Sequence, residues 1–372
     1  MQWMEIEAMN LSRRHAIALL TALAAPMAVR DALAGQDSLF LTSMRDAAGG
    51  FAAALINERG DVLYRLPLKA RAHDGAMSSD GRSAVLFARR PGHFILVFDV
   101  RHRTVTHQIA ARDDRHFYGH GFYSADGKLL FAAENDFDNA RSVLGIYDAT
   151  QDYARIGEYD GGGVGCHQAI LLSDGETIAV ANGGIATHPD YPREKLNLAQ
   201  MDPCLTYLRA SDGNILQTVR LPRAYEKLSI RHLTEVTPGT VWVAGQYEGS
   251  LAECPSLLGV HQGGAEMRPV EMQPSLVHAM NYYTGAIVAS GDKNRVIATS
   301  PRGGIVGIWD AKSQALQNTM MRPDVCGAAP DGQTFVVTDG MGQISNDQQI
   351  LSSIDGIAYD NHLVPVPPKA SL

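Results

Sequence analysis

A repeating unit of short apolar strands constrains the fold of this chain more than any other feature. Each unit has a turn with Asp-Gly or Pro-Gly, an apolar strand after it, and a further strand that usually ends in Asp. The ends of that further strand recur roughly every 50 residues, which is the length of a four-stranded propeller blade. They are Asp99, Asp148, Leu208, His261, Asp310 and Asp355. The pattern therefore predicts an all-β protein, with no amphipathic helix of ordinary length.

The two ends of the chain predict how the ring of blades closes. Residues 39–43, 51–57 and 61–66 form an N-terminal unit of three strands that lacks an inner one, and 359–366 is a surplus strand. Supplying that strand to the first unit would cover two open sheet edges, which otherwise invite aggregation. We therefore expect a seven-bladed β-propeller closed by the C-terminal strand. Eight blades and an unusual barrel are the alternatives.

The N-terminal 34 residues have the pattern of an export signal. Arg13-Arg14 precedes an apolar run over 16–29 and a small-x-small site at 32–34, as in twin-arginine signals. Ala16 stands where that pattern usually has Phe, so the general secretory route is the alternative. We expect cleavage near Gly35 and a periplasmic mature chain. It would be a single propeller domain over 35–372, without a membrane span.

Composition narrows the function classes. The net charge of −8 leaves no basic footprint for nucleic acid. The 36 glycines and the low aromatic content, 7%, fit many short strands and tight turns. Four cysteines in an exported chain allow one disulfide, and Cys204 and Cys254 occupy similar positions in neighbouring units.

One histidine recurs at the same place in successive units, and this regularity predicts a metal site. Each lies on the predicted inner strand, six or seven residues before the turn, and ring closure adds a fifth: His73, His120, His167, His232 and His362. Inner strands of a propeller line its channel, so these imidazoles are expected near one axis. Neutral imidazole is the commonest protein ligand for iron, copper, zinc and nickel. A hydrogen-bonded channel with a structural role is the alternative.

Further polar residues are expected around the same channel. Asn281 with His278, and Asp324 with Cys326, would fill the register of the remaining two units. Cys326 would be a soft ligand favouring copper, or a small buried residue. The ends of the second strands would form a second polar ring, including Glu134, Asn135 and Asn182. The insertion that follows Asn182 carries His188 and Lys195 and is expected to be a lid, or else a solvated excursion.

Several longer segments resemble a known protein family. RHFYGHG at 115–121, AENDF at 133–137, VANGGIATHPDYPREKLNL at 180–198, LSIRHL at 228–233, ATSPRGG at 298–304, PDVCG at 323–327 and YDNHL at 359–363 carry the resemblance. It is to exported bacterial propellers classed as domain of unknown function 1513, which are similar to YVTN and WD40 propellers. It extends over about residues 38–366.

The resemblance implies a role but no known reaction. Members are often encoded beside imelysin-like periplasmic proteins and a di-haem, peroxidase-like protein, which implies such partners and periplasmic iron, or copper, acquisition. The family residues carried over are His73, His120, Glu134, Asn135, His167, Asn182, His188, Lys195, Arg231, His232, Arg302, Asp324, Cys326 and His362. This chain departs from the family at Cys166-His167-Gln168, where a carboxylate follows the histidine in other members.

Two other functions compete with metal handling. A lactonase-like or metal-oxidase enzyme could use the same cavity, with oxygen ligands from Glu134, Asn135, Asn182 and Asp324. A protein-interaction module would keep the channel as a purely structural feature.

Overall fold

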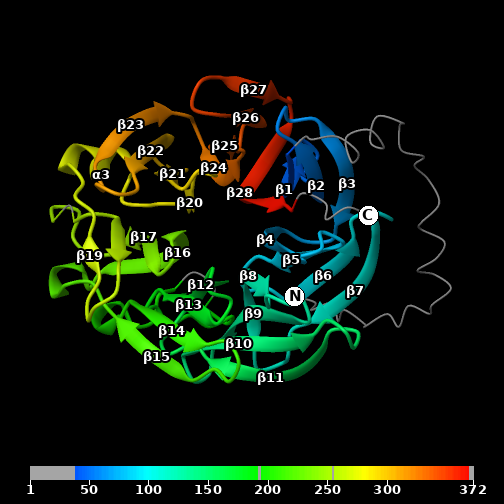
Figure 1. Ribbon diagram of the computed structural model, residues 1–372, viewed down its shortest axis with the longest axis horizontal. Coiled ribbons are helices and arrows are strands. Elements are labelled where there is room, and N and C mark those ends of the chain that lie inside the picture. Colours follow the sequence, from blue (N-terminus) through cyan, green and yellow to red (C-terminus); the bar gives the residue numbers. More distant parts are fainter. Residues whose placement is uncertain (1–37, 192–193, 254, 368–372) are drawn as a thin grey trace, which may run out of the picture. The chain divides into compact units, whose positions relative to one another are not determined.

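The computed structural model describes residues 38–191, 194–253 and 255–367. In this part of the chain, 28 strands form seven four-stranded antiparallel sheets arranged in a ring (Figure 1). The predicted seven-bladed β-propeller is confirmed.

Each blade runs from an inner strand at the channel to an outer strand at the rim. Blades one to four contain β28 (Ile357–Val366), β1 (Leu39–Asp46), β2 (Phe51–Asn57) and β3 (Val62–Leu68); β4 (Ala72–Met77), β5 (Ser83–Ala88), β6 (Phe94–Asp99) and β7 (Thr104–Ala110); β8 (His116–Tyr123), β9 (Leu129–Asp136), β10 (Arg141–Asp148) and β11 (Ala154–Asp160); β12 (Cys166–Leu171), β13 (Thr177–Asn182), β14 (Cys204–Arg209) and β15 (Ile215–Val219).

Blades five to seven continue the ring. They contain β16 (Leu228–Thr237), β17 (Thr240–Tyr247), β18 (Leu258–His261) and β19 (Arg268–Pro269); β20 (Ala286–Ala289), β21 (Arg295–Ser300), β22 (Ile305–Asp310) and β23 (Leu316–Met321); β24 (Val325–Asp331), β25 (Thr334–Asp339), β26 (Gln343–Ser345) and β27 (Ile350–Ser353). The helical segments among the described residues are α3 (Pro274–Ala279) and two 3₁₀ turns, η1 (Leu198–Gln200) and η2 (Arg223–Tyr225).

The C-terminal strand closes the ring as expected. β28 pairs antiparallel with β1, with Val366 opposite Leu39 and Leu363 opposite Thr42. The Thr42 hydroxyl also donates a hydrogen bond of 2.9 Å to the His362 carbonyl. Because β28 belongs to blade one, His362 lies in the same register as the other four histidines.

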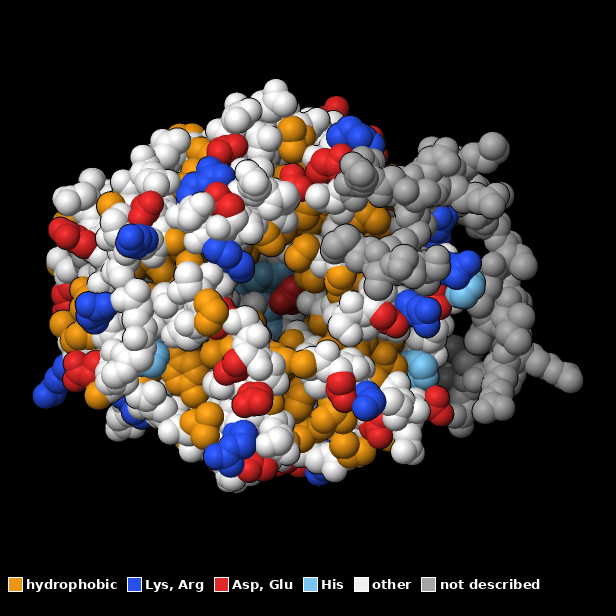
Figure 2. Space-filling model, in the orientation of Figure 1, with side chains coloured by type: hydrophobic (Ala, Val, Ile, Leu, Met, Phe, Trp, Pro, Cys, Tyr) orange, Lys and Arg blue, Asp and Glu red, His pale blue; other side chains and the backbone are white. Residues whose placement is uncertain are grey.

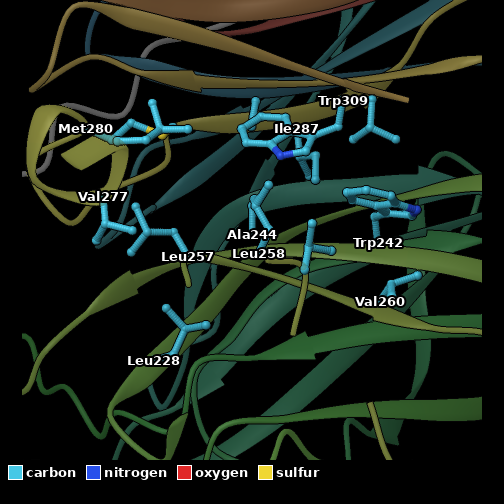
Figure 3. Packing of buried hydrophobic residues seen from close by; sticks show 14 of the residues in the cluster. Leu228, Trp242, Ala244, Leu257, Leu258, Val260, Val277, Met280, Ile287 and Trp309 are labelled. Carbon is cyan, nitrogen blue, oxygen red and sulfur yellow. The ribbon is translucent and has the colours of Figure 1, made fainter. Parts of the chain in front are cut away.

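The core lies between neighbouring blades. Second strands such as β5 are buried over almost their whole length, while the rim strand β7 is mostly exposed. Figure 3 shows one such interface, where Trp242 and Leu258 of blade five face Ile287 and Trp309 of blade six. Each large side chain buried in this way stabilises the fold by about 1.5–3 kcal/mol relative to an exposed one. These interfaces hold the inner strands in place around the channel.

One predicted strand belongs to a different position in its blade. The segment 350–355 was expected to be a third strand, but β27 is the fourth strand of blade seven. The third strand, β26, has only three residues, which is too short for a recognisable alternation of apolar and polar positions.

Some expectations lie outside the described residues. These are Cys254 and the export signal over 1–34, which stays a prediction. The expected partner of Cys254 is a free, buried cysteine, so the structure does not contain the Cys204–Cys254 disulfide. No helix in the described part of the chain is long and apolar enough to cross a membrane.

Candidate metal centre

The five predicted channel histidines form one cluster. Their rings follow one another in a closed loop, with centroid separations of 4.7 Å from His362 to His73, 4.9 Å to His120, 5.1 Å to His167, 4.8 Å to His232 and 5.0 Å back to His362. The other four ring centroids all lie within 5.5 Å of that of His120. Histidine side chains are visible inside the central hollow of the molecule (Figure 2). The inner strands therefore aim five imidazoles at one region.

Irregular strand pairing explains why these side chains turn inward. The inner strand of every histidine-bearing blade has a register shift at its histidine, for example between Ala72 and Gly75 in β4 and between Phe117 and Gly121 in β8. Such bulges bend a strand and re-aim a side chain. The shift is not confined to these blades: β24 of blade seven also has one, at Cys326, while β20 of blade six pairs with β21 without a shift.

Two carboxylates from neighbouring blades lie beside two of the rings, and one of them forms a hydrogen bond. The carboxylate of Asp74 in blade two is hydrogen-bonded to the ring of His120 in blade three, with a distance of 2.7 Å between Oδ2 and Nδ1. Asp360 of blade one lies beside His73 of blade two, but its Oδ1 is 3.5 Å from Nδ1 of that ring, which is too long for a normal hydrogen bond. A carboxylate against Nδ1 leaves the lone pair on Nε2 of His120, which is the arrangement typical of a metal-binding histidine. Sequence reasoning missed both residues, although each stands within two positions of a channel histidine.

Four of the rings have a buried nitrogen without a hydrogen-bond partner among the described residues. These atoms are Nδ1 of His73, Nε2 of His120, Nδ1 of His232 and Nε2 of His362. Buried polar atoms are rarely left unpaired in native proteins, so several at one point call for an explanation. A bound ion would satisfy them.

Burial keeps the rings in the form that binds metals. It lowers the pKa of His73 to about 4, although the Asp360 carboxylate opposes the shift. Burial, reinforced by the neighbouring histidines, also holds the pKa of His167, His232 and His362 well below the usual value of 6.5. These imidazoles are therefore neutral at pH 7, and neutral imidazole is the metal-ligating species.

The donor atoms can be grouped in two ways around a single ion. His73, His120 and His362 offer nitrogens within 4.8 Å of one another, and so do His120, His167 and His232. His120 belongs to both groups, and its Nδ1 is taken by Asp74. It therefore has one nitrogen to give, and an ion bound through it uses one group or the other. Three imidazoles with room for another ligand suit a transition metal.

Gly119 allows the rings to pack closely. Its φ of +102° lies in a region that side chains disfavour, and a Cβ there would approach Cδ2 of His73 to 2.8 Å. The glycine before His120 is thus a requirement of the cluster itself.

The polar residues expected from the second strands lie elsewhere. Glu134 is buried in its own blade, where its carboxylate accepts hydrogen bonds from the Tyr147 hydroxyl at 2.6 Å and the Arg155 guanidinium at 3.0 Å. Asn135 donates to the Thr187 carbonyl and contacts His116. These groups stabilise contacts within and between elements, and none of them joins the histidine groups.

Asn182 likewise serves the junction of neighbouring blades. It accepts a hydrogen bond from the Ser142 hydroxyl at 2.7 Å and donates one to the Gly161 carbonyl at 2.9 Å. The oxygen site proposed for a lactonase from Glu134, Asn135, Asn182 and Asp324 is therefore not assembled. The end of β13 thus points into the interface between two blades, whereas the carboxylate of Glu134 near the end of β9 is bound within its own blade.

Blades six and seven do not continue the register of channel ligands. Asn281 and His278 lie at the exposed end of α3, before β20 begins, and Asp324 is exposed ahead of β24. The Cys326 thiol is buried, and it donates towards the Asp360 carbonyl at 3.1 Å. Burial raises the pKa of this thiol, which disfavours the thiolate that metals bind. The structure thus separates Cys326 from the five histidines.

The predicted lid residues lie at one mouth of the channel. Lys195 and Arg231 line a cavity of about 50 Å³ together with His167, and Lys195 pairs with Glu248. His188 is further out, with Nε2 3.4 Å from Asp138. The guanidinium of Arg302 lies 4.6 Å from the centroid of the Tyr283 ring, above its face.

The opposite mouth of the channel has a different lining. A cavity of about 520 Å³ reaches His232, His362 and Asp74 between mostly apolar walls that include Phe122 and Ile287. The histidine cluster thus borders one cavity on each side.

Comparison with known proteins identifies the family. The family described as "Protein of unknown function (DUF1513)" matches residues 66–366, which is most of the chain. The chain belongs to this family. No curated protein matches the sequence. A chain of Kuenenia stuttgartiensis hydrazine synthase is similar in structure, with a TM-score of 0.61 and 10% identity over 83% of this chain and 95% of that chain. At that identity the likeness concerns the fold alone.

Proposed function

We propose that this propeller binds a transition-metal ion on its axis and serves in periplasmic iron, or copper, handling together with neighbouring proteins. The observation that carries the proposal is the cluster of five imidazoles, four of which have a buried nitrogen without a hydrogen-bond partner among the described residues. A channel built only for structure would pair these atoms with one another or with the backbone, as the chain does around Asn182.

The donor chemistry supports a metal of the iron-to-zinc range. Nitrogen donors suit Fe(II), Cu(II), Ni(II) and Zn(II), whereas calcium and magnesium take oxygen ligands. Among these divalent metals, copper(II) is expected to bind the purified protein most tightly, since the affinity of such a site follows the Irving–Williams order. The choice of iron rests on the family resemblance, whose members are often encoded beside imelysin-like and haem-containing proteins. Export to the periplasm rests on the sequence of residues 1–34.

Metal titration tests this function. The purified chain, stripped of metal, is titrated with Fe(II) without oxygen and with Cu(II), and bound metal is counted by mass spectrometry. We expect about one equivalent in the wild type and loss of binding in His120→Ala, because both histidine groups need this ring. His102→Ala is the matched control, since His102 is 70% exposed and lies outside the channel. Less than about 0.1 equivalent of either metal in the wild type would contradict the proposal.

A further inference from the structure

A set of cationic side chains at one mouth of the channel has no part in the proposed metal site. Arg90, Lys195 and Arg231 line the cavity of about 50 Å³ that reaches His167, and Ser229 adds a hydroxyl. Arg231 and Arg302 both lie over the ring of Tyr283, at 6.0 Å and 4.6 Å from its centroid. We call Arg90, Lys195, Arg231 and Arg302 the basic mouth.

The positive charge of the basic mouth is only partly neutralised, although the carboxylate of Glu194 also lines the cavity. Arg90 and Arg302 form no ion pair with the described residues, and Arg231 reaches only Glu248, at 3.6 Å. Glu248 is already paired with Lys195. A half-buried guanidinium among other guanidinium groups is a site that attracts an anion.

The metal site needs negative charge that its own donors do not supply. Imidazole nitrogens bring no negative charge to an ion. Of the nearby carboxylates, Asp360 is paired with Arg71, and Asp74, which lies against His120, brings a single charge. An ion of charge +2 among neutral donors in a buried site is costly unless an anion compensates it. His167 is the ring that the metal groups and the cavity of the basic mouth have in common.

We infer that the basic mouth binds a carboxylate-type oxyanion, which enters beside His167 and completes the coordination of the metal. This inference rests on the proposed metal site. A carboxylate is planar and has two oxygens. One oxygen can accept hydrogen bonds from a guanidinium group while the other binds the metal. The cavity is small, since one water needs about 10–15 Å³ of such volume. It therefore takes bicarbonate or a single carboxylate arm, while the rest of a larger chelate stays outside near Arg302.

Coupling between anion and metal tests the inference. The metal-free protein is titrated with cobalt(II), whose visible spectrum reports its ligands, in degassed chloride buffer and then with bicarbonate, citrate or phosphate added. Free cobalt is calculated with the known stability of each complex in solution. We expect cobalt to bind about tenfold more tightly with a carboxylate anion, a usual size for coupling between two ligands. Its spectrum should change at the same time.

The choice of anion distinguishes two sources of the carboxylate. Enhancement by bicarbonate indicates a small co-ligand taken from solution, and enhancement by citrate alone indicates a metal chelate bound as a unit; both support the inference. Equal affinity in all four buffers would overturn it and leave the proposed metal site standing. Enhancement by phosphate only would also overturn it. Failure of cobalt to bind in every buffer would overturn both.

Variants locate the anion. In Arg231→Gln the ratio of cobalt affinities with and without the carboxylate should fall to about one, because a guanidinium that lines the cavity beside His167 is gone. Arg231→Lys should recover part of it, since a lysine keeps the charge but lacks the planar fork. Arg82→Gln, at a side chain 68% exposed on blade two, is the control and should keep the full ratio. An unchanged ratio in folded Arg231→Gln would place the anion elsewhere and overturn the inference.

Discussion

Two buried polar clusters of this protein look alike in the sequence and differ in the structure. Around Glu134, both carboxylate oxygens are hydrogen-bonded, to Tyr147 and Arg155. Around His120, four rings keep an unpartnered nitrogen among the described residues. Burial is shared, so burial does not mark a functional site. The difference lies in whether the polar atoms are satisfied, and the unsatisfied cluster is the one that awaits a ligand.

The pH dependence of stability should separate the two clusters most strongly. The pKa of His73 is about 4 in the folded protein, and burial also lowers those of His167, His232 and His362. Below about pH 6.5 the unfolded chain binds protons that the folded chain does not, so the free energy of unfolding falls. We expect metal-free protein to lose up to about 1.4 kcal/mol per pH unit for each such ring between pH 6.5 and 4. Urea denaturation over this range measures it, and constant stability down to pH 4.5 would contradict the burial of neutral rings.

The Glu134 cluster should matter for stability alone. Glu134→Ala removes the buried partner of Arg155 and should lower the free energy of unfolding by about 3 kcal/mol. Cobalt affinity should stay unchanged, because no oxygen of Glu134 faces the histidines. Glu158→Ala is the matched control: Glu158 also pairs with Arg155 but is 28% exposed, so its loss should cost under about 1 kcal/mol. Weaker metal binding by folded Glu134→Ala would contradict the claim that the Glu134 cluster serves stability alone.

The carboxylate beside His120 should affect metal binding instead. Asp74→Asn keeps the shape of the side chain but no longer fixes the proton on Nδ1 of the ring. We expect cobalt affinity to fall by about 10–100-fold, as for other residues that orient a metal ligand. Isothermal titration calorimetry measures the change. Full affinity in this variant would mean that His120 is not held as a ligand.

The smallest effect is expected at Cys326. Cys326→Ala removes a buried thiol that contacts backbone carbonyl groups and should cost about 1 kcal/mol of stability. The affinities for copper and cobalt should stay within about twofold of those of the wild type, which corresponds to less than about 0.5 kcal/mol of binding free energy. Loss of copper binding in Cys326→Ala would show that the thiol is a copper ligand after all.

The fold was predictable because its determinants are local. Short apolar strands, turns at regular intervals and a surplus C-terminal strand are visible in the residues, and they led to seven blades and to the register of His362. The histidines were found for the same reason, as one copy per unit. Blade six broke the pattern because α3 occupies the place where an inner strand was expected, which moved Asn281 out of the channel.

The finer parts of the site depend on long-range geometry. Strand ends such as Asn182 are polar whether they face the channel or a neighbouring blade, and only the packing of blades decides between the two. The bulges that turn His73 and His120 inward leave no recognisable pattern in the residues. Asp74 and Asp360 could have been found, since a carboxylate within two residues of a candidate ligand is a common feature of metal sites.

The central claim is that the clustered imidazoles are metal ligands. X-ray absorption spectroscopy of the protein loaded with one equivalent of zinc(II) tests it most directly, because zinc is redox-silent and shares the preference for imidazole. The account predicts at least three imidazole nitrogens at about 2.0–2.1 Å from the ion, reduced in His120→Ala. A first shell of oxygen atoms only, or one containing the sulfur of Cys326, would contradict it.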